Sequence, residues 1–359
     1  MPRKIEKVRA AEATDTIDDL LAGVGLAHGR RLIRRGSPRY RRQEPDELIE
    51  TPPTELAVHR DGAVETMAVP RWQKTHVPHA FSTRRGGLST AYRRDESTAG
   101  EMSPGEMNLG LTESDEAANV LENRRLLLAA AGAEGRTLVT LKQIHSNLTR
   151  RVTRADAERP EKHGLMRADG LMTDDPEVML GIQTADCVPV LVRDRRTHAV
   201  AAFHAGWRGT LKRIVEGGIG KMRLEFGSRP EDLEAAIGPA IGACCYAVGE
   251  EVRSEFLSQF SYAAELFSEV YDSDPVKEKY PLLFLTARAP GHSHMGPNLH
   301  LDLIEANRRQ LLDAGLTAKS IATAYRCTNC EPKTFFSYRA EHGFCGRMMA
   351  LIGASRRTG

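Results

Sequence analysis

Apolar positions divide the chain into a weakly patterned N-terminal part and a regularly patterned remainder. Through residue 70, charged and proline-containing segments alternate with little apolar periodicity, and only residues 13–25 resemble a short helix, with a threonine cap and a closing glycine. From about residue 71 to residue 353, short β-branched runs alternate with well-capped helical segments, and no low-complexity gap marks a second boundary. The pattern predicts a basic, partly disordered extension over residues 1–70 and one large domain over residues 71–359.

Three helices and several strands are predicted inside this domain. Helices are expected over residues 112–132, 209–227 and 301–315, because each segment carries an apolar stripe at three-to-four spacing and ends on glycine. Strands are expected over residues 136–146, 178–184, 188–194, 198–204, 233–239 and 320–327. Many of these strands are joined by short loops, which favours an α+β fold with mixed or antiparallel sheets over a doubly wound parallel fold.

The composition is that of a globular protein without a membrane span. Of the 359 residues, 41% are hydrophobic and 27% are charged, and no apolar run approaches the roughly 18 residues that a membrane span requires. The N-terminus lacks the apolar core of a secretory signal, so a cytoplasmic location is the default expectation. The six cysteines, two of them adjacent, do not resemble a disulfide framework and are expected to be free thiols or metal ligands.

Charge gives the protein as a whole no electrostatic reason to bind nucleic acid, because the net charge is only +2. The charge is uneven, however, since residues 30–43, RRLIRRGSPRYRRQ, are rich in arginine. Such a segment could seek phosphate groups, although a solvated tail is the more common use of such a run. Nucleic acid is therefore not an expected partner, and the sequence does not determine the oligomeric state.

Residues 185–209, ADCVPVLVRDRRTHAVAAFHAGWRG, contain the densest chemical pattern of the chain. If the two apolar runs form a hairpin whose loop is centred between Arg195 and Arg196, Val190 faces Ala201 and Cys187 faces His204. Directly opposed side chains of an antiparallel pair have Cβ atoms about 4.5–5.5 Å apart, which lets a thiolate and an imidazole bind one metal ion. The hairpin is thus predicted to hold a cysteine and a histidine at one open end.

A third ligand is offered by His145 in KQIHSN, at the end of the preceding apolar run. A set of one cysteine and two histidines leaves a fourth position on zinc for water or substrate, as in catalytic sites. The spacing alone leaves other interpretations open. A cysteine in a buried strand often serves as a small hydrophobic residue, and a histidine at a strand end often forms a surface hydrogen bond.

The motifs FSTRRGGLS, MNLG, KQIHS, TADCVPVL, FHAGWRGT, AIGPAIGACCYAVG and CTNC...FFSYRAEHGFCGRMM occur here in one order. This order resembles the YfiH-type laccase-domain family, also named for multicopper polyphenol oxidases, over roughly residues 71–353. The resemblance implies an α/β/β/α layered domain and a purine nucleoside phosphorylase with adenosine deaminase activity. It also implies a zinc ion bound by His145, Cys187 and His204, the set that the strand pairing selects.

The sequence departs from the family pattern at two places. Ala247 stands in CCYAVG where the family often has an acidic residue, which puts the nucleoside preference in doubt. An added segment over residues 286–298 carries His292 and His294, which are expected to form a polar surface loop, with a second metal site as the alternative.

Four further residues are candidates for the site. Arg84 and Arg208 are expected to bind phosphate, because a guanidinium group offers two-pronged contacts; an exposed arginine in a turn is the alternative for both. Asp186 adjoins a ligand and is expected to act in proton transfer or in support of that ligand, or else to anchor the strand end. Asn108 is expected to bond to substrate or to satisfy a buried backbone turn.

The remaining cysteines give a weaker signal. CTNC at residues 327–330 has the spacing of a zinc knuckle, but no second pair follows it, and Cys345 could be recruited as a third ligand. Cys244 and Cys245 are expected to be small buried packing residues. Trp207 is expected to pack beneath the site, with stacking on a base as the alternative.

The leading hypothesis is a zinc-dependent phosphorylase that acts on a purine nucleoside and phosphate and also deaminates adenosine. A copper-dependent polyphenol oxidase is one alternative, but multicopper chemistry needs many H-x-H pairs, and only residues 292–294 have that form. A nucleotide- or nucleic-acid-binding protein that uses residues 30–43 is the other alternative. Zinc is the expected metal, and copper is possible on the family name.

Overall fold

Short, largely apolar strands build two six-stranded sheets in the computed structural model, which describes residues 31–34, 55–93, 105–158, 165–271 and 298–356. The first sheet has the order β2-β3-β4-β17-β10-β7, and the second has the order β16-β13-β11-β12-β9-β8. Most neighbouring strands are antiparallel, whereas the edge pairs β10–β7, β13–β16 and β8–β9 are parallel. The sheets are therefore mixed, as the sequence pattern predicted.

The strands of the first sheet are β2 (Ala57–Asp61), β3 (Val64–Ala68), β4 (His79–Ser82), β7 (Thr137–Val139), β10 (Val178–Thr184) and β17 (Met348–Gly353). Those of the second are β8 (Thr149–Arg151), β9 (Gly170–Thr173), β11 (Val188–Asp194), β12 (Val200–Ala205), β13 (Leu233–Ile237) and β16 (Ile321–Thr323). A two-stranded sheet pairs β5 (Arg85–Gly87) with β6 (Gly105–Glu106), and a three-stranded sheet has the order β1 (Arg31–Arg34), β14 (Phe267–Tyr271), β15 (Asn298–Leu301).

The main core lies between the two six-stranded sheets. Leu180 and Ile182 of β10 and Ile352 of β17 are fully buried against Leu191 of β11 and Ala202 of β12. Burial of such side chains stabilises a fold by about 1.5–3 kcal/mol each. The face-to-face packing of the sheets is thus the central layer of the molecule.

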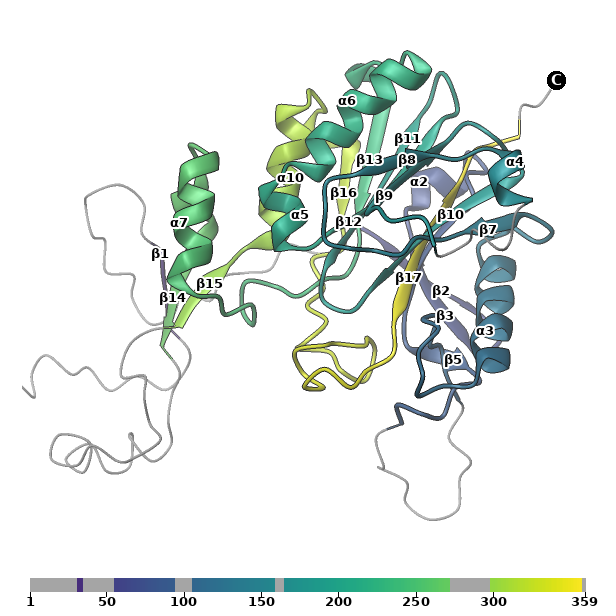
Figure 1. Cartoon of the computed structure of the whole chain (residues 1–359), viewed down its shortest axis with the longest axis horizontal. Helices are drawn as coiled ribbons and strands as arrows, with labels where there is room; N and C mark the ends of the chain where they lie inside the picture. The colour runs from purple at the N-terminus through teal and green to yellow at the C-terminus, as the bar shows by residue number, and fades with distance from the viewer. Residues whose placement is uncertain (1–30, 35–54, 94–104, 159–164, 272–297, 357–359) are drawn as a thin grey trace, which may run out of the picture.

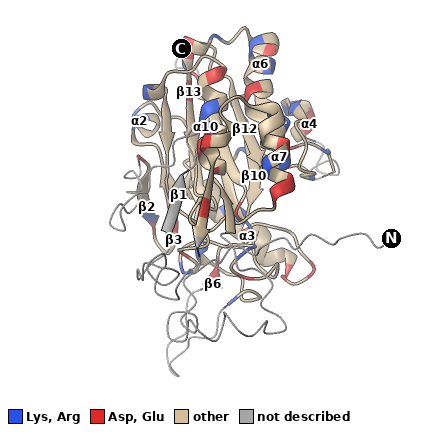
Figure 2. Cartoon of the chain, turned by 90° about the vertical axis from the view of Figure 1, so that its left-hand side faces the viewer, with Lys and Arg blue, Asp and Glu red and all other residues tan. Residues whose placement is uncertain are grey.

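Helices cover the two outer faces of this double layer (Figure 1). Helix α3 (Ala117–Ala130) packs Leu127 against Met179 and Leu351 of the first sheet. Helices α5 (Trp207–Leu211), α6 (Ile214–Phe226) and α10 (Leu303–Asp313) cover the second sheet. Figure 2 shows that α6, α7 (Glu250–Gln259) and α10 carry charged residues, while the strands behind them are mostly uncharged. The α/β/β/α layering is confirmed.

The short helices are α2 (Pro70–Gln73), α4 (Arg154–Ala157), η2 (Pro230–Asp232), η3 (Ala263–Leu266) and η4 (Ala318–Ser320). Within the described residues, no helix combines the length and the apolar character that crossing a membrane needs.

The helices predicted from sequence are present, with different boundaries. The segment predicted as one helix over residues 209–227 is split into α5 and α6, because Arg213 has a left-handed backbone with φ of 59°. Helix α10 begins at Leu303, two residues after the predicted start, because the Asp302 carboxylate caps it by accepting the Glu305 N–H at 2.9 Å. The helix predicted over residues 13–25 lies outside the described residues, as do His292 and His294.

The expected extension over residues 1–70 shares residues with the first sheet. Strands β2 and β3 precede residue 70, form a hairpin with each other and continue into the sheet through β4. Strand β1, which lies within the arginine-rich segment 30–43, pairs with β14. The folded part of the chain therefore begins before residue 71. The motifs that resemble the laccase-domain family, in contrast, begin only after residue 71.

The β11–β12 hairpin differs from the predicted register by two residues. Val190 lies opposite Phe203, not Ala201, and Pro189, not Cys187, lies opposite His204. Because the shift is even, every side chain stays on the predicted face of the sheet. Cys187 and His204 therefore remain at the same end of the hairpin.

The shift arises in the loop between the strands. The Asp194 carboxylate accepts the N–H groups of Arg196 and Thr197 at 2.7 and 2.9 Å, and His198 takes a left-handed backbone with φ of 64°. This turn centres the loop one residue later than the symmetric arrangement assumed from sequence.

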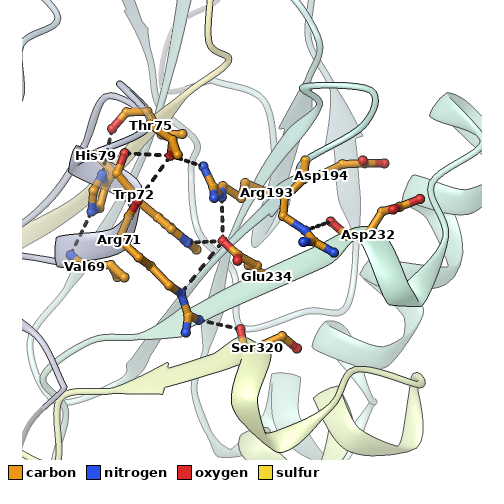
Figure 3. A network of polar contacts seen from close by, with 12 residues as sticks. Val69, Arg71, Trp72, Thr75, His79, Arg193, Asp194, Asp232, Glu234 and Ser320 are labelled. Carbon is orange, nitrogen blue, oxygen red and sulfur yellow. Dashed lines mark hydrogen bonds and ion pairs between the residues drawn. The ribbon is translucent and has the colours of Figure 1, made fainter.

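A buried polar network fastens α2 and β4 to the second sheet (Figure 3). Trp72, which is fully buried, donates its indole N–H to the Glu234 carboxylate at 2.7 Å, and Arg193 donates to the same oxygen at 2.7 Å. His79 accepts the Val69 N–H at 2.8 Å through Nε2. Through Trp72 the network joins α2 to β11 and β13 of the second sheet.

His79 makes stability depend on pH. Burial, together with the nearby Arg193 and His59, lowers its pKa to about 4 from the ordinary 6.5, against a hydrogen bond to Val77 that raises it. The unfolded chain therefore binds a proton on this imidazole between pH 6.5 and 4 that the folded chain does not, so its stability contribution is present above pH 6.5 and is lost as pH falls. His79→Gln should abolish about 2 kcal/mol of the stability lost between pH 7 and pH 5.

Urea unfolding at the two pH values measures this difference. His76→Asn is the matched control, because His76 is exposed and asparagine tolerates its left-handed backbone. An equal loss of stability in wild type and His79→Gln would contradict the prediction.

Candidate functional site

The site lies at the end of the second sheet where β11 begins and β12 ends. Cys187 precedes β11 directly and is partly buried, and His204 is buried near the end of β12. His145 lies in the loop after β7 and is exposed. The predicted strand over residues 136–146 is shorter than expected, and its last residues form this loop instead.

The carboxylate of Asp169, next to β9, positions both histidines. Its oxygens accept the backbone N–H of His145 at 2.9 Å and that of Ser146 at 2.6 Å, together with the Ser146 hydroxyl at 2.7 Å. Its Oδ1 lies 2.9 Å from Nδ1 of His204. Asp169 thereby holds His145 in a left-handed turn with φ of 57° and leaves Nε2 of His204 for another partner.

The three predicted ligands come together. Nε2 of His145 lies 4.0 Å from Sγ of Cys187, the two imidazole rings have centroids 5.0 Å apart, and one donor atom from each residue lies within 4.8 Å of the others. Gly206 is required beside them, because a Cβ there would lie 3.0 Å from both the Cys187 sulfur and a His145 ring carbon. The donors and the space around them therefore fit a single metal ion.

The electrostatics of these groups favour a thiolate. Burial alone would raise the pKa of Cys187, but the charge of His204 and hydrogen bonds from both histidines lower it to about 6. Burial likewise opposes the charge of His204, yet Cys187 and Asp169 raise its pKa to about 9. For Asp169, the hydrogen bonds from His204 and Ser146 outweigh burial and lower the pKa to about 2. Cys187 is thus favoured as a thiolate, the form of cysteine that binds a metal cation.

Asp186 serves as an anchor in the structure. It has a left-handed backbone with φ of 88°, its carboxylate accepts the Thr328 hydroxyl at 2.6 Å and the Arg339 N–H at 2.7 Å, and its carbonyl accepts the Ile241 N–H at 2.9 Å. These bonds fix the direction in which the chain enters Cys187. The geometry matches the anchoring alternative stated for Asp186, and the proton-transfer role stays a prediction.

Exposed arginines lie beside the same end of the sheet. The guanidinium of Arg208 lies 4.3 Å above the Trp207 ring, and that of Arg339 lies 5.5 Å from the Tyr246 ring. Burial and the charge of Cys187 raise the pKa of the Tyr246 hydroxyl, while Arg339 and Arg208 oppose the rise. Tyr246 thus lies within electrostatic reach of the predicted ligand Cys187 and of both arginines.

Arg84 and Asn108 use their polar groups for contacts within the protein. Arg84 donates four hydrogen bonds, to Glu106, Glu341 and the carbonyls of Pro332 and Tyr92, and its Nη2 also forms an ion pair with Glu106. Arg84 is also buried, so it has no N–H left for phosphate. Asn108 is fully buried and bonds to both backbone groups of Gly110, which matches the backbone-turn alternative stated for it.

The cysteines of CTNC have partners other than those predicted. Cys327 and Cys330 lie with Cys244 and Cys245 in one group. Cys345, the predicted third ligand, is instead buried in the core between the sheets. The prediction of Cys244 and Cys245 as buried packing residues is wrong, because both are only partly buried and face other sulfur atoms.

The sequence reasoning missed Asp169, Gly206, Tyr246 and Arg339. Gly206, Tyr246 and Arg339 stand inside motifs that were singled out, HAGWRG, CCYAVG and FFSYRA, but nothing in their spacing assigned them a contact. Asp169, in RADG before a strand, carries no signal beyond an acidic residue at a strand start, because its donors come from two distant segments, residues 144–146 and His204.

Asp169 should be central to stability as well as to the site. Asp169→Asn leaves His204 and the loop of His145 without their common acceptor, so the free energy of unfolding of the metal-free protein at pH 7 should fall by about 3 kcal/mol. Chemical denaturation measures the loss. Asp174→Asn is the control, since this exposed residue has only a surface ion pair with Arg151 and should change stability by less than about 0.5 kcal/mol. Equal stability of the two variants would refute the role of Asp169.

Comparison with known proteins identifies a family and similar chains. A family model described as multi-copper polyphenol oxidoreductase laccase matches residues 78–355. A purine nucleoside phosphorylase of Deinococcus radiodurans is 35% identical over 283 residues, which are 79% of this chain and 91% of the relative. Adenosine deaminase RL5, from an unknown prokaryotic organism, is 31% identical over 72% of this chain and 87% of its own length.

A solved structure extends the similarity to the fold. The crystal structure of YlmD from Geobacillus stearothermophilus superposes with a TM-score of 0.65 at 29% sequence identity, over 85% of this chain and all of that chain. The family model covers both six-stranded sheets except for β2 and β3, together with every residue of the His145, Cys187 and His204 set. The chain belongs to the multi-copper polyphenol oxidoreductase laccase family.

Proposed function

We propose that this protein is a zinc-dependent purine nucleoside phosphorylase that also deaminates adenosine. Its substrates would be a purine nucleoside such as adenosine, inosine or methylthioadenosine, and phosphate, and its products the free base and ribose-1-phosphate. The observation that carries the proposal is the group of His145, Cys187 and His204 around one point, oriented by Asp169. The reaction itself is proposed from the names of the similar proteins, a purine nucleoside phosphorylase and an adenosine deaminase.

The donor set fits zinc. One thiolate and two imidazoles are borderline-soft ligands, and three protein ligands leave a fourth position for water or substrate. When bound, zinc would act as a Lewis acid toward a substrate oxygen or an activated water. The donors favour zinc over a blue-copper centre, which also needs a weak axial methionine, and over multicopper chemistry, which needs many histidines. Among the described residues, two clusters have side chains spaced to bind a metal ion, and together they contain only two histidines, His145 and His204.

The chain's own residues would perform the rest of the chemistry. In phosphorolysis a phosphate oxygen bonds to C1′ of the ribose, the C1′–N9 bond breaks, and the purine accepts a proton. Arg208 and Arg339 are exposed beside the ligands and offer the positive charge that holds phosphate there. Trp207 and Tyr246 supply ring surfaces at the same place. Asp186 keeps Cys187 in position and is a positioning residue in this scheme.

Deamination would use the same site differently. Water adds to C6 of adenosine, the amino group leaves as ammonia, and a proton must reach that leaving nitrogen. His204 is held as a positively charged imidazole in the metal-free chain by Cys187 and Asp169, but as a ligand it is neutral, so the proton is expected from water or phosphate. The phosphorylase and deaminase activities therefore share ligands and differ in the attacking oxygen.

The first test is turnover by the purified, metal-quantified protein. Adenosine and inosine are incubated with and without phosphate, and free base, ribose-1-phosphate and ammonia are separated by chromatography. We expect phosphate-dependent base release that falls at least 100-fold in Cys187→Ala. Cys345→Ala is the control for loss of a thiol away from the site. Stoichiometric zinc without any turnover would refute the nucleoside assignment.

Arg208 should act on phosphate binding. Arg208→Ala removes a two-pronged charge contact, so the KM for phosphate should rise about 10-fold or more while the KM for nucleoside changes little. Arg125→Ala, on α3 at the opposite outer layer, is the matched control because Arg125 is exposed and pairs only with Glu122. Initial rates at varied phosphate concentration measure the phosphate KM. An unchanged phosphate KM in Arg208→Ala would show that Arg208 does not bind phosphate.

A further inference from the structure

Four cysteines from two distant parts of the chain meet beside the site. Cys244 and Cys245 follow β13, and Cys327 and Cys330 follow β16. Strands β13 and β16 are parallel neighbours, so their C-terminal ends reach the same edge of the second sheet. The pairing continues past the strands, because the Thr328 N–H donates to the Ala240 carbonyl at 3.0 Å. Topology therefore brings the two cysteine pairs together.

The sulfur atoms have the spacing of a single metal site. Sγ of Cys330 lies 3.3 Å from that of Cys245 and 3.5 Å from that of Cys244, and all four sulfurs lie within 4.8 Å of one another. A tetrahedral zinc ion with bonds of about 2.3 Å separates its four sulfurs by about 3.8 Å, whereas a disulfide requires about 2.05 Å. The structure joins none of these cysteines in a disulfide.

The surroundings are those of a ligand loop rather than of a hydrophobic core. Gly242 donates its N–H to the Cys327 sulfur at 3.2 Å, and tight turns fold the chain around both pairs, from Gly242 to Cys245 and from Cys327 to Glu331. A Cβ at Gly242 would lie 3.2 Å from the Cys244 sulfur. Cys330 is exposed and the other three are partly buried. This exposure differs from that of Cys345, which is buried in the apolar core.

Four thiolates at the spacing of these sulfur atoms repel one another unless a cation offsets their charge, and cysteines bind a metal ion as thiolates.

We propose that Cys244, Cys245, Cys327 and Cys330 bind one zinc ion in a closed tetrahedral site, separate from the site of His145, Cys187 and His204. Four thiolates at this spacing select zinc or a single iron ion over harder cations, and a cluster of several irons needs wider separation. A closed set of four protein ligands leaves no position for substrate, so the ion is structural.

Its physical effect reaches the first site through Asp186. Thr328, next to Cys327, donates its hydroxyl to the Asp186 carboxylate, and Ile241, three residues before Cys244, donates its N–H to the Asp186 carbonyl. Both loops that the ion ties together thus hold the residue that precedes Cys187. The second zinc fixes that wall of the site without touching substrate.

Metal content of the full-length protein tests the proposal. The chain is purified with reductant, saturated with zinc, desalted and measured by plasma mass spectrometry. We expect two zinc ions per chain in wild type, one in Cys187→Ala, and one in Cys330→Ser. Cys345→Ser is the matched control and should keep two, because Cys345 is a thiol of the apolar core.

Cobalt substitution of Cys187→Ala identifies the remaining ligands and does not depend on folding of the Cys330 variant. The intense thiolate-to-cobalt charge transfer and tetrahedral ligand-field bands of a four-sulfur site are expected. Cys187→Ala without bound metal, or a disulfide between these cysteines in protein prepared with reductant, would overturn the proposal. Neither result bears on nucleoside turnover, so failure here is distinguishable from failure of the proposed reaction.

Discussion

The buried carboxylate of Asp169 is the interaction on which the candidate site depends. It joins the loop of His145, the start of β9 and the ring of His204, three parts of the chain that no local pattern connects. Its negative charge sustains the charge of His204, which in turn lowers the pKa of Cys187. Favourable contacts thus run from the Asp169 carboxylate through His204 to the Cys187 thiolate, and they are strengthened because Asp169 and His204 are buried.

The double sheet gives this arrangement its rigidity. The β11–β12 hairpin has one face in the main core and the other beneath α6 and α10, so the end that carries Cys187 and His204 cannot shift without disturbing both layers. Asp186, which directly precedes Cys187, is held by hydrogen bonds from Thr328, Arg339 and Ile241. The candidate site therefore consists of Cys187 and His204 at strand ends and His145 in a loop, supported by the hydrogen bonds of Asp169 and Asp186.

Arginines that the sequence alone does not distinguish have different roles in the fold. Arg84 is saturated by Glu106, Glu341 and two carbonyls and binds the C-terminal loops to the first sheet. Arg208 and Arg339 remain exposed beside the candidate ligands. The difference is one of burial: a buried guanidinium must satisfy all of its N–H groups within the protein, whereas an exposed one keeps some for a ligand.

The sequence by itself predicted a mixed α+β domain and the approximate positions of α3 and α10, because apolar period and capping residues are local properties, and its motifs selected His145, Cys187 and His204 as candidates. It did not determine the hairpin register, the break at Arg213, the duties of Asp169 and Arg84, or the meeting of Cys245 with Cys330, 85 residues apart. Those features depend on turn geometry and on which strand ends become neighbours. Only the tertiary structure decides them, since the contacts join segments whose local patterns carry no record of each other.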